Sequence, residues 1–171
     1  MRIAAHVVLA YVLILFIGCL WRFVPLGRMT PDIVALSAVY LGLTARERLA
    51  PATAGAVVLG YLGDLLFGTP RGFLAVTAGI VCIFGQLIHR RLLVRGVVVT
   101  AAVSFVTGLV SGLIGLGLRA YADLIPARAG VEFGVIAGSA AITGILGPPL
   151  FRLFRALDAR FGRTYRAREV N

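Results

Sequence analysis

The sequence is poor in charge and has no lysine. Charged residues make up 14% of the chain, whereas about 25% is usual in a soluble domain. Hydrophobic residues make up 60%, against roughly 45–50% in soluble domains. This excess is too large for a soluble core and indicates that lipid surrounds much of the chain. Because a membrane-crossing helix needs about 20 residues, the spans leave little room for an extramembrane catalytic domain.

Residues that bind metals or form disulfides are also scarce. The two cysteines, Cys19 and Cys82, lie inside apolar stretches, with no CxxC or metal-ligand spacing, so each is expected to act as a small hydrophobe. His6 has no second ligand at helical spacing, and His89 adjoins arginines and is expected to be solvated. We therefore predict no metal and no cofactor.

Acidic residues are few, which leaves a net charge of +10. In a soluble protein this charge would suggest nucleic acid, but no basic–aromatic nucleic-acid motif is present. In a membrane protein, loop arginines set the topology and meet anionic headgroups. We predict the second role and no nucleic-acid partner.

Six apolar segments are predicted to be transmembrane helices, which makes the chain an all-α integral membrane protein. They span residues 3–21, 31–45, 49–67, 72–88, 96–118 and 131–151. The first ends at Trp21-Arg22 without a small-residue cleavage site, so it is expected to be a retained span and not a signal peptide.

The second segment is the shortest. Thr30 is predicted to cap it, with Pro31 in the first turn and Asp32 facing the positive end of the helix dipole. Its length of about 22 Å falls short of the ~30 Å hydrocarbon core. We expect it to begin earlier or to sit against neighbouring helices where the bilayer is thinned.

Arginines favour alternate loops. One side carries Arg2, Arg46, Arg48, Arg90, Arg91, Arg95, Arg152, Arg155, Arg160, Arg163, Arg166 and Arg168, and the other carries Arg22, Arg28, Arg71, Arg119 and Arg128. The positive-inside rule places both termini in the cytoplasm. An odd number of spans would put the arginine-rich end outside, so the charge pattern supports six.

The chain divides into a six-helix transmembrane domain at 1–151 and a basic tail at 152–171. Pro148 and Pro149 are expected to kink or end the last span. Beyond them, Phe151, Phe154, Leu157 and Phe161 recur at helical spacing between charged residues. This pattern predicts an amphipathic helix on the inner membrane face, or a docking surface for a cytoplasmic partner.

Asp64 is the most notable residue within a span. A carboxylate there is costly and normally faces the bundle interior with a partner. Arg71 follows the turn and could fold back onto it. Three roles stay open: a polar lock between the third and fourth helices, a contact with a partner subunit, and proton or ion handling.

Small residues recur at helical spacing. Gly60, Gly68 and Gly72 lie four or eight residues apart, Gly108 and Gly112 form a GxxxG, and Gly134 with Gly138 repeats it. This spacing lets helix backbones approach closely in membranes. The contacts are expected to be internal, although some could seat a foreign helix.

Enzyme activity is not expected. An intramembrane aspartyl peptidase needs two carboxylates that share a site, and Asp32 and Asp64 are the only candidates. The residues before Asp64 do not form GxGD, and no Ser–His pair, Cys–His pair or phosphate-binding glycine loop is present.

Three stretches resemble the rod shape-determining protein MreD family. Residues 31–42, from Pro31-Asp32, look like the start of that family's second span. Gly60, Asp64, Gly68, Pro70 and Gly72 follow at family-like spacing. Gly144-Ile-Leu-Gly-Pro148-Pro149-Leu-Phe-Arg is similar to its closing span and basic exit.

The resemblance implies a non-catalytic subunit of the bacterial inner membrane. Its partner would be the scaffold MreC, with indirect links to actin-like MreB and to a shape-type glycosyltransferase and a transpeptidase that build peptidoglycan. It also implies a fold similar to substrate-binding subunits of energy-coupling-factor transporters.

That fold suggests an alternative function, a substrate-capture subunit of a vitamin transporter. The small residues four apart by which such subunits dock through their first helix are absent here, because Val8 and Leu9 follow Ala4 and Ala5. The polar groups Gln86, Ser104, Thr107, Ser111, Ser139 and Thr143 are expected to be scattered over three helices.

Overall fold

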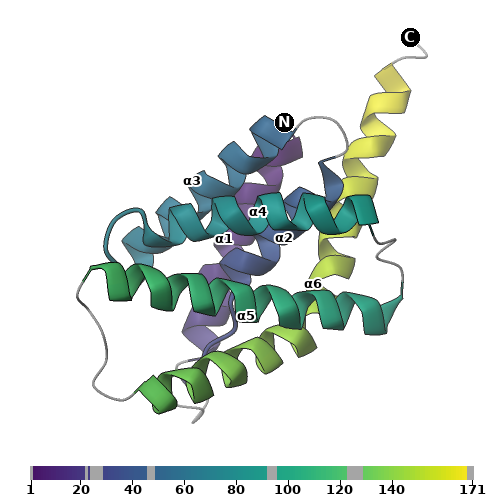
Figure 1. The fold of residues 1–171 in the computed structure, drawn as a ribbon. Helices are drawn as coiled ribbons and strands as arrows, with labels where there is room; N and C mark the ends of the chain where they lie inside the picture. The colour runs from purple at the N-terminus through teal and green to yellow at the C-terminus, as the bar shows by residue number, and fades with distance from the viewer. Residues whose placement is uncertain are drawn as a thin grey trace.

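The chain is all-helical throughout the part that the structure describes. The computed structural model describes residues 2–21, 23, 29–45, 49–91, 96–122 and 129–168. Its six helices are α1 (Arg2–Trp21), α2 (Ile33–Thr44), α3 (Leu49–Phe67), α4 (Phe73–Arg91), α5 (Val97–Tyr121) and α6 (Ala129–Arg168) (Figure 1). All six predicted helical segments are therefore confirmed.

Four helices are long and apolar enough to cross a membrane. They occupy residues 3–21, 49–67, 97–121 and 130–160, whereas α2 and the apolar part of α4 are shorter. Large apolar side chains cover the outside of the bundle, among them Val8 at 63% and Phe16 at 62% exposed. A soluble surface would not carry so many, and the chain is an α-helical membrane protein.

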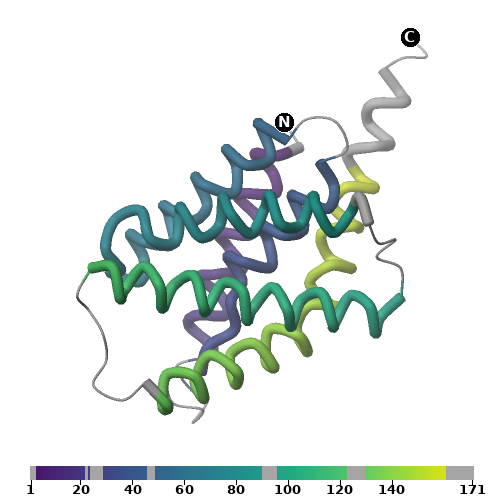
Figure 2. Tube along the Cα trace, in the orientation of Figure 1, coloured from purple at the N-terminus to yellow at the C-terminus, as the bar shows by residue number. Residues whose placement is uncertain are grey.

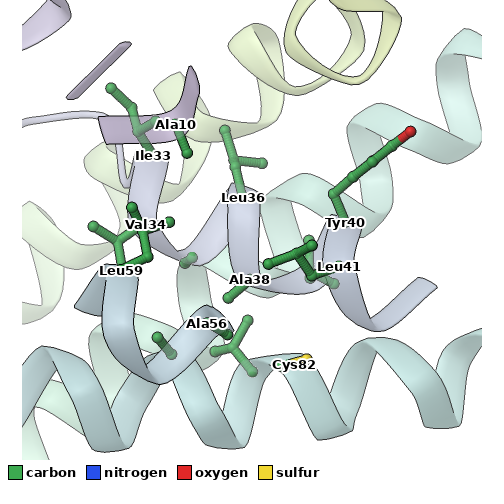
Figure 3. Close-up of a cluster of buried hydrophobic side chains, with 14 of the residues drawn as sticks. Ala10, Ile33, Val34, Leu36, Ala38, Tyr40, Leu41, Ala56, Leu59 and Cys82 are labelled. Carbon is green, nitrogen blue, oxygen red and sulfur yellow. The ribbon is translucent and has the colours of Figure 1, made fainter. Parts of the chain in front are cut away.

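Helix α2 is the centre of the bundle. Every residue from Ile33 to Leu43 is buried, and α2 contacts all five other helices. Its core contacts include Leu59 of α3 and Cys82 of α4 (Figure 3). With 12 residues, it is about 18 Å long, so it is shorter than predicted and depends on its neighbours for burial.

Glycines let α4 approach α2 at backbone distance. A Cβ placed on Gly42 would overlap the carbonyl oxygen of Cys82, and one on Gly85 would lie 2.7 Å from the carbonyl oxygen of Val39. The two backbones are thus packed more closely than side chains would allow. The sequence interpretation missed both glycines, because neither belongs to a GxxxG pair.

Helix α6 bends and continues past its two prolines. Pro148 and Pro149 lie inside the helix, each removes a backbone donor, and α6 changes direction along its length (Figure 1). The prediction of a kink is confirmed. The helix does not end near residue 151, where the tail was expected to begin.

The bend directs the second half of α6 into the bundle. Phe154 is 0% exposed and Phe151 4%, with Tyr40 of α2 in ring contact with both at 5.0 and 5.2 Å. The prediction that these phenylalanines lie on the membrane face is wrong, because burial against α2 removes them from lipid. The side chain of Phe161 lies outside the described residues.

The start of α1 and the second half of α6 meet at one end of the bundle, where His6 approaches Asp158. We call this the terminal end. The turn between α3 and α4 lies at the opposite end, as the backbone trace shows (Figure 2). Six of the arginines used for the topology lie outside the described residues: Arg22, Arg28, Arg46, Arg48, Arg95 and Arg128.

Gly42→Ala is expected to lower the free energy of unfolding by about 1–3 kcal/mol, because the added methyl overlaps the α4 backbone. Gly18→Ala is the matched control, since Gly18 is helical with nothing near its would-be Cβ, and it should be neutral or stabilising by up to about 1 kcal/mol. Thermal unfolding in mild detergent, followed by circular dichroism, measures both. Equal effects would contradict the close packing of α2 and α4.

Candidate functional site

A cavity of about 380 Å³ lies at the end opposite the terminal end. Its walls come from α1, the segment before α2, the turn between α3 and α4, and helices α5 and α6. Elements that are distant in the sequence thus line one cavity. Among the predicted residues, Pro31, Asp32, Pro70, Gly108 and Gly112 line it.

Asp32 caps α2 and ties it to the other helices of the cavity. One carboxylate oxygen accepts the N–H of Ala35 at 2.9 Å, and the other accepts the hydroxyl of Ser111. The Asp32 N–H donates to the Thr143 hydroxyl at 3.0 Å. The N-cap is therefore Asp32 and not Thr30 as predicted, because a carboxylate so placed satisfies an otherwise unpaired N–H of the first turn.

Polar side chains of three elements converge here. Ser111 of α5 and Ser139 and Thr143 of α6 line the cavity with Asp32. The prediction that these groups are scattered is wrong for these residues, because α5 and α6 pack side by side. Gln86, Ser104 and Thr107 do not line it.

An ion pair joins the end of α5 to the start of α6. Arg119 Nη1 lies 3.8 Å from Glu132 Oε2, and both residues line the cavity. The Arg119 side chain is 51% exposed and the Glu132 side chain 11%. Arg119 and Glu132 therefore carry offsetting charges at the more exposed part of the cavity.

Asp64 joins α3 to α4 beside this cavity. Its carboxylate is buried and accepts the Thr69 hydroxyl and the N–H groups of Gly72, Leu74 and Ala75 at 2.9, 3.0 and 3.4 Å. These N–H groups belong to the start of α4, where a carboxylate is favoured. Asp64 thus joins α3 to the start of α4, as expected of a polar lock, the first of the three roles left open.

Arg71 is not the partner of Asp64. Its side chain is exposed, and the described part of the chain contains no ion pair between the two. The backbone N–H groups of the α4 start take the place that the sequence interpretation gave to the guanidinium. Arg71 remains an exposed charge at the turn between α3 and α4, which we call the Asp64 corner.

The glycines of the Asp64 corner have two different roles. A Cβ on Gly60 would overlap the backbone of Leu74, so Gly60 permits close packing of α3 on α4, as predicted. Gly68 and Gly72 adopt φ of +63° and +97°, a conformation that glycine adopts without strain. For these two the packing interpretation is wrong, because a Cβ would meet open space.

The α5 glycines pack inside the subunit. A Cβ on Gly108 would lie 2.9 Å from Ala140 Cα, and one on Gly112 would lie 2.6 Å from Ile136 Cγ2. On α6, a Cβ on Gly138 would overlap Met29, whereas one on Gly134 would meet open space. Gly108 and Gly112 therefore bring α5 and α6 close together within the subunit, as expected.

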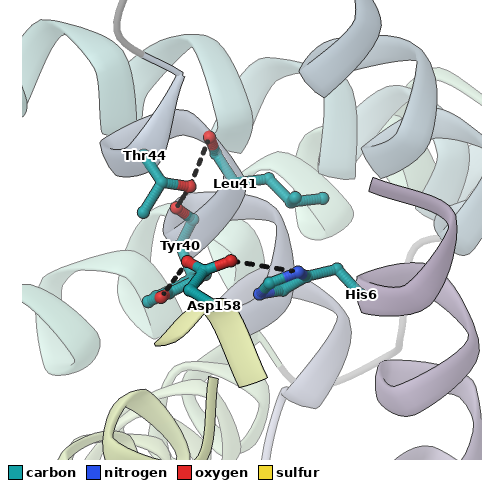
Figure 4. Close-up of polar contacts among 5 residues, drawn as sticks. All are labelled: His6, Tyr40, Leu41, Thr44 and Asp158. Carbon is teal, nitrogen blue, oxygen red and sulfur yellow. Dashed lines mark hydrogen bonds and ion pairs between the residues drawn. The ribbon is translucent and has the colours of Figure 1, made fainter. Parts of the chain in front are cut away.

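A second polar cluster lies at the terminal end, and the sequence interpretation missed it (Figure 4). Asp158 Oδ2 accepts the Tyr40 hydroxyl at 2.8 Å, and Asp158 Oδ1 lies 3.8 Å from His6 Nδ1. The His6 ring is buried and stacks on Tyr40 at 5.3 Å. One signal was available, since Asp158 shares a helix face with Phe151 and Phe154.

The described residues contain no group of three or more His, Cys, Asp or Glu side chains that could hold a metal ion. Asp32 and Asp64 bind separate sets of donors and do not form a shared carboxylate pair. A scan against protein-family models, a search of curated proteins and a search of solved structures each found no match for the chain.

Asp64→Ala is expected to lower the free energy of unfolding by about 3 kcal/mol or more, because it leaves several buried donors without their charged acceptor. Asp64→Asn should destabilise less, since one amide oxygen still accepts. Arg71→Ala should stay within about 0.5 kcal/mol of the wild type. Thermal unfolding in detergent measures all three, and a large effect of Arg71→Ala would favour the ion pair instead.

Tyr40→Phe is expected to cost about 1 kcal/mol, because it removes one hydrogen bond and keeps the ring contacts. Tyr11→Phe is the control, since the described part of the chain shows no hydrogen bond of the Tyr11 hydroxyl. Both are measured by the midpoint of thermal unfolding. Equal midpoints for the two variants would show that the bond to Asp158 adds no stability.

Proposed function

We propose that the chain is a non-catalytic subunit of the bacterial rod elongation complex. It lies in the inner membrane and binds an MreC-like scaffold that has one transmembrane helix and a periplasmic part. Through that scaffold it acts with an actin-like MreB filament and with a shape-type glycosyltransferase and a transpeptidase. Its role is to organise peptidoglycan synthesis and rod cell shape.

One observation carries this proposal. The residues of the MreD-like pattern are those on which the fold depends at one end of the bundle. Asp32 caps the central helix, Asp64 locks α3 to α4, and Gly68 and Gly72 form the turn between them. A pattern that arose by chance in an apolar sequence would not be expected to coincide with such positions.

The distribution of the arginines supports a topology in which both termini are cytoplasmic. With both termini in the cytoplasm, the cavity and the Asp64 corner face the periplasm, where the scaffold's folded part lies. At the terminal end, Arg152, Arg155 and Arg160 are exposed on α6. This basic surface would meet anionic lipid headgroups or a cytoplasmic filament.

A second candidate is substrate capture for an energy-coupling-factor type transporter. The observation that favours it is the cavity, in which Asp32, Ser111, Ser139 and Thr143 converge. Small-molecule sites are concave and mostly apolar with a few convergent polar groups. The MreD-like pattern favours the first proposal.

Affinity purification of the N-terminally tagged protein from its native membrane in mild detergent, followed by mass spectrometry, tests the two proposed functions. Recovery of a single-span periplasmic coiled-coil protein with cell-wall synthases is expected. Recovery of a pair of ABC-type ATPases and a coupling membrane protein would overturn the proposal in favour of substrate capture.

Arg71→Glu should reduce recovery of the periplasmic scaffold, because it reverses an exposed charge at the periplasmic corner. Arg152→Glu, the matched reversal at the terminal end, should leave that recovery unchanged. The ratio of scaffold to tagged subunit is measured for each variant. Equal recovery with both variants would place the contact away from the corner.

A further inference from the structure

The cavity contains a carboxylate, that of Asp32, which pairs with no cationic side chain of the described residues. Asp32 is half-buried and accepts hydrogen bonds from two neutral donors, the Ala35 N–H and the Ser111 hydroxyl. Among the described residues, no cationic side chain forms an ion pair with it. Arg119 is already paired with Glu132, so Asp32 is the remaining acidic side chain among the lining residues.

The walls around this carboxylate are apolar. Phe67, Phe73, Leu116 and Ile136 are among the lining residues. A volume of about 380 Å³ lies within the range of small-molecule sites. The described residues also lack a cluster of metal-ligating side chains, which argues against a bare metal ion.

We propose that the cavity binds a small organic cation, a protonated amine on an apolar body, with the ammonium at Asp32. This inference does not depend on the proposed function, because a scaffold subunit and a capture subunit could each carry such a site. An ionised carboxylate in a mostly apolar cavity is costly without a counter-charge, and a bound ammonium would offset that cost.

The lining supplies the remaining contacts that such a ligand needs. An ammonium has three donors, and the Asp32 carboxylate and the hydroxyl oxygens of Ser111 and Ser139 are acceptors that line the same cavity. Aromatic rings attract cations over their faces, and Phe67 and Phe73 line the same space. The apolar body would lie against the aliphatic wall.

A natural reporter lies beside the cavity. Trp21 is the single tryptophan of the chain, and its indole N–H donates to the Met29 carbonyl at 2.8 Å. It lines a neighbouring hollow that shares Ile14, Thr30 and Pro31 with the cavity. Binding should therefore change tryptophan fluorescence.

The experiment titrates the full-length protein in detergent with 2-phenylethylammonium and with its neutral isostere 2-phenylethanol. Isothermal titration calorimetry and Trp21 fluorescence follow the binding. We expect saturable binding of the cation, at least about tenfold tighter than the alcohol, because only the cation can form an ion pair with the Asp32 carboxylate.

Three variants assign the site. Asp32→Asn keeps the size and the N-cap oxygen but removes the charge, so the cation should lose its advantage over the alcohol. Gly115→Leu should block the cavity, because Gly115 lines it and has open space at its would-be Cβ. Gly117→Leu is the matched control, since Gly117 is exposed on the same helix and does not line the cavity.

Loss of cation binding in Gly115→Leu with retention in Gly117→Leu supports the site even if Asp32→Asn fails to fold. Equal binding of cation and alcohol to the wild type would overturn the proposal that the ligand is a cation. Cation binding that survives both Asp32→Asn and Gly115→Leu would place the ligand elsewhere, and the absence of saturable cation binding would overturn the proposal outright.

Discussion

The fold depends on a central helix that is too short to cross a bilayer. Helix α2 is about 18 Å long in a hydrocarbon core of about 30 Å, so other parts of the protein must surround both of its ends. Backbone groups cannot be left unpaired at that depth. At its start, the Asp32 carboxylate accepts a first-turn N–H; near its end, the Thr44 hydroxyl donates to the Tyr40 carbonyl.

The two ends of α2 are completed differently. In the last turns of α2, the bent half of α6 brings Phe151 and Phe154 against Tyr40. The cavity lies at the start of α2. The bend of α6 at its two prolines thus serves one end of the short helix, and the cavity lies at the other.

Much of this fold follows from local sequence signals. The bounds of α3 agree with the prediction because the arginine-bearing segment before Leu49 and the Gly68-Thr69-Pro70 turn interrupt an apolar run on both sides. Asp64 was recognised because a carboxylate within a span needs partners. That its partners are the N–H groups of α4, and not Arg71, depends on how α4 begins and is not encoded in residue spacing.

The contacts that escaped prediction join residues far apart in the chain. His6, Tyr40 and Asp158 come from α1, α2 and α6, and nothing in their individual surroundings reveals that they meet. The convergence of Ser111, Ser139 and Thr143 on Asp32 likewise requires the packing of α5 on α6. Hydrophobic patterning fixes which segments are helical, whereas the relative rotation of the helices decides which polar groups share a space.

The close backbone contact of α2 with α4 has a consequence for how the protein enters the membrane. A segment as short as Ile33–Thr44 gains too little from lipid to remain there alone, and its Gly42 surface is covered by the α4 backbone at Cys82 and Gln86. Residues through α4 must therefore leave the ribosome before α2 reaches its final position. Stable insertion of α2 in this sense depends on α4, whereas α1 and α3 are each long and apolar enough to cross a membrane.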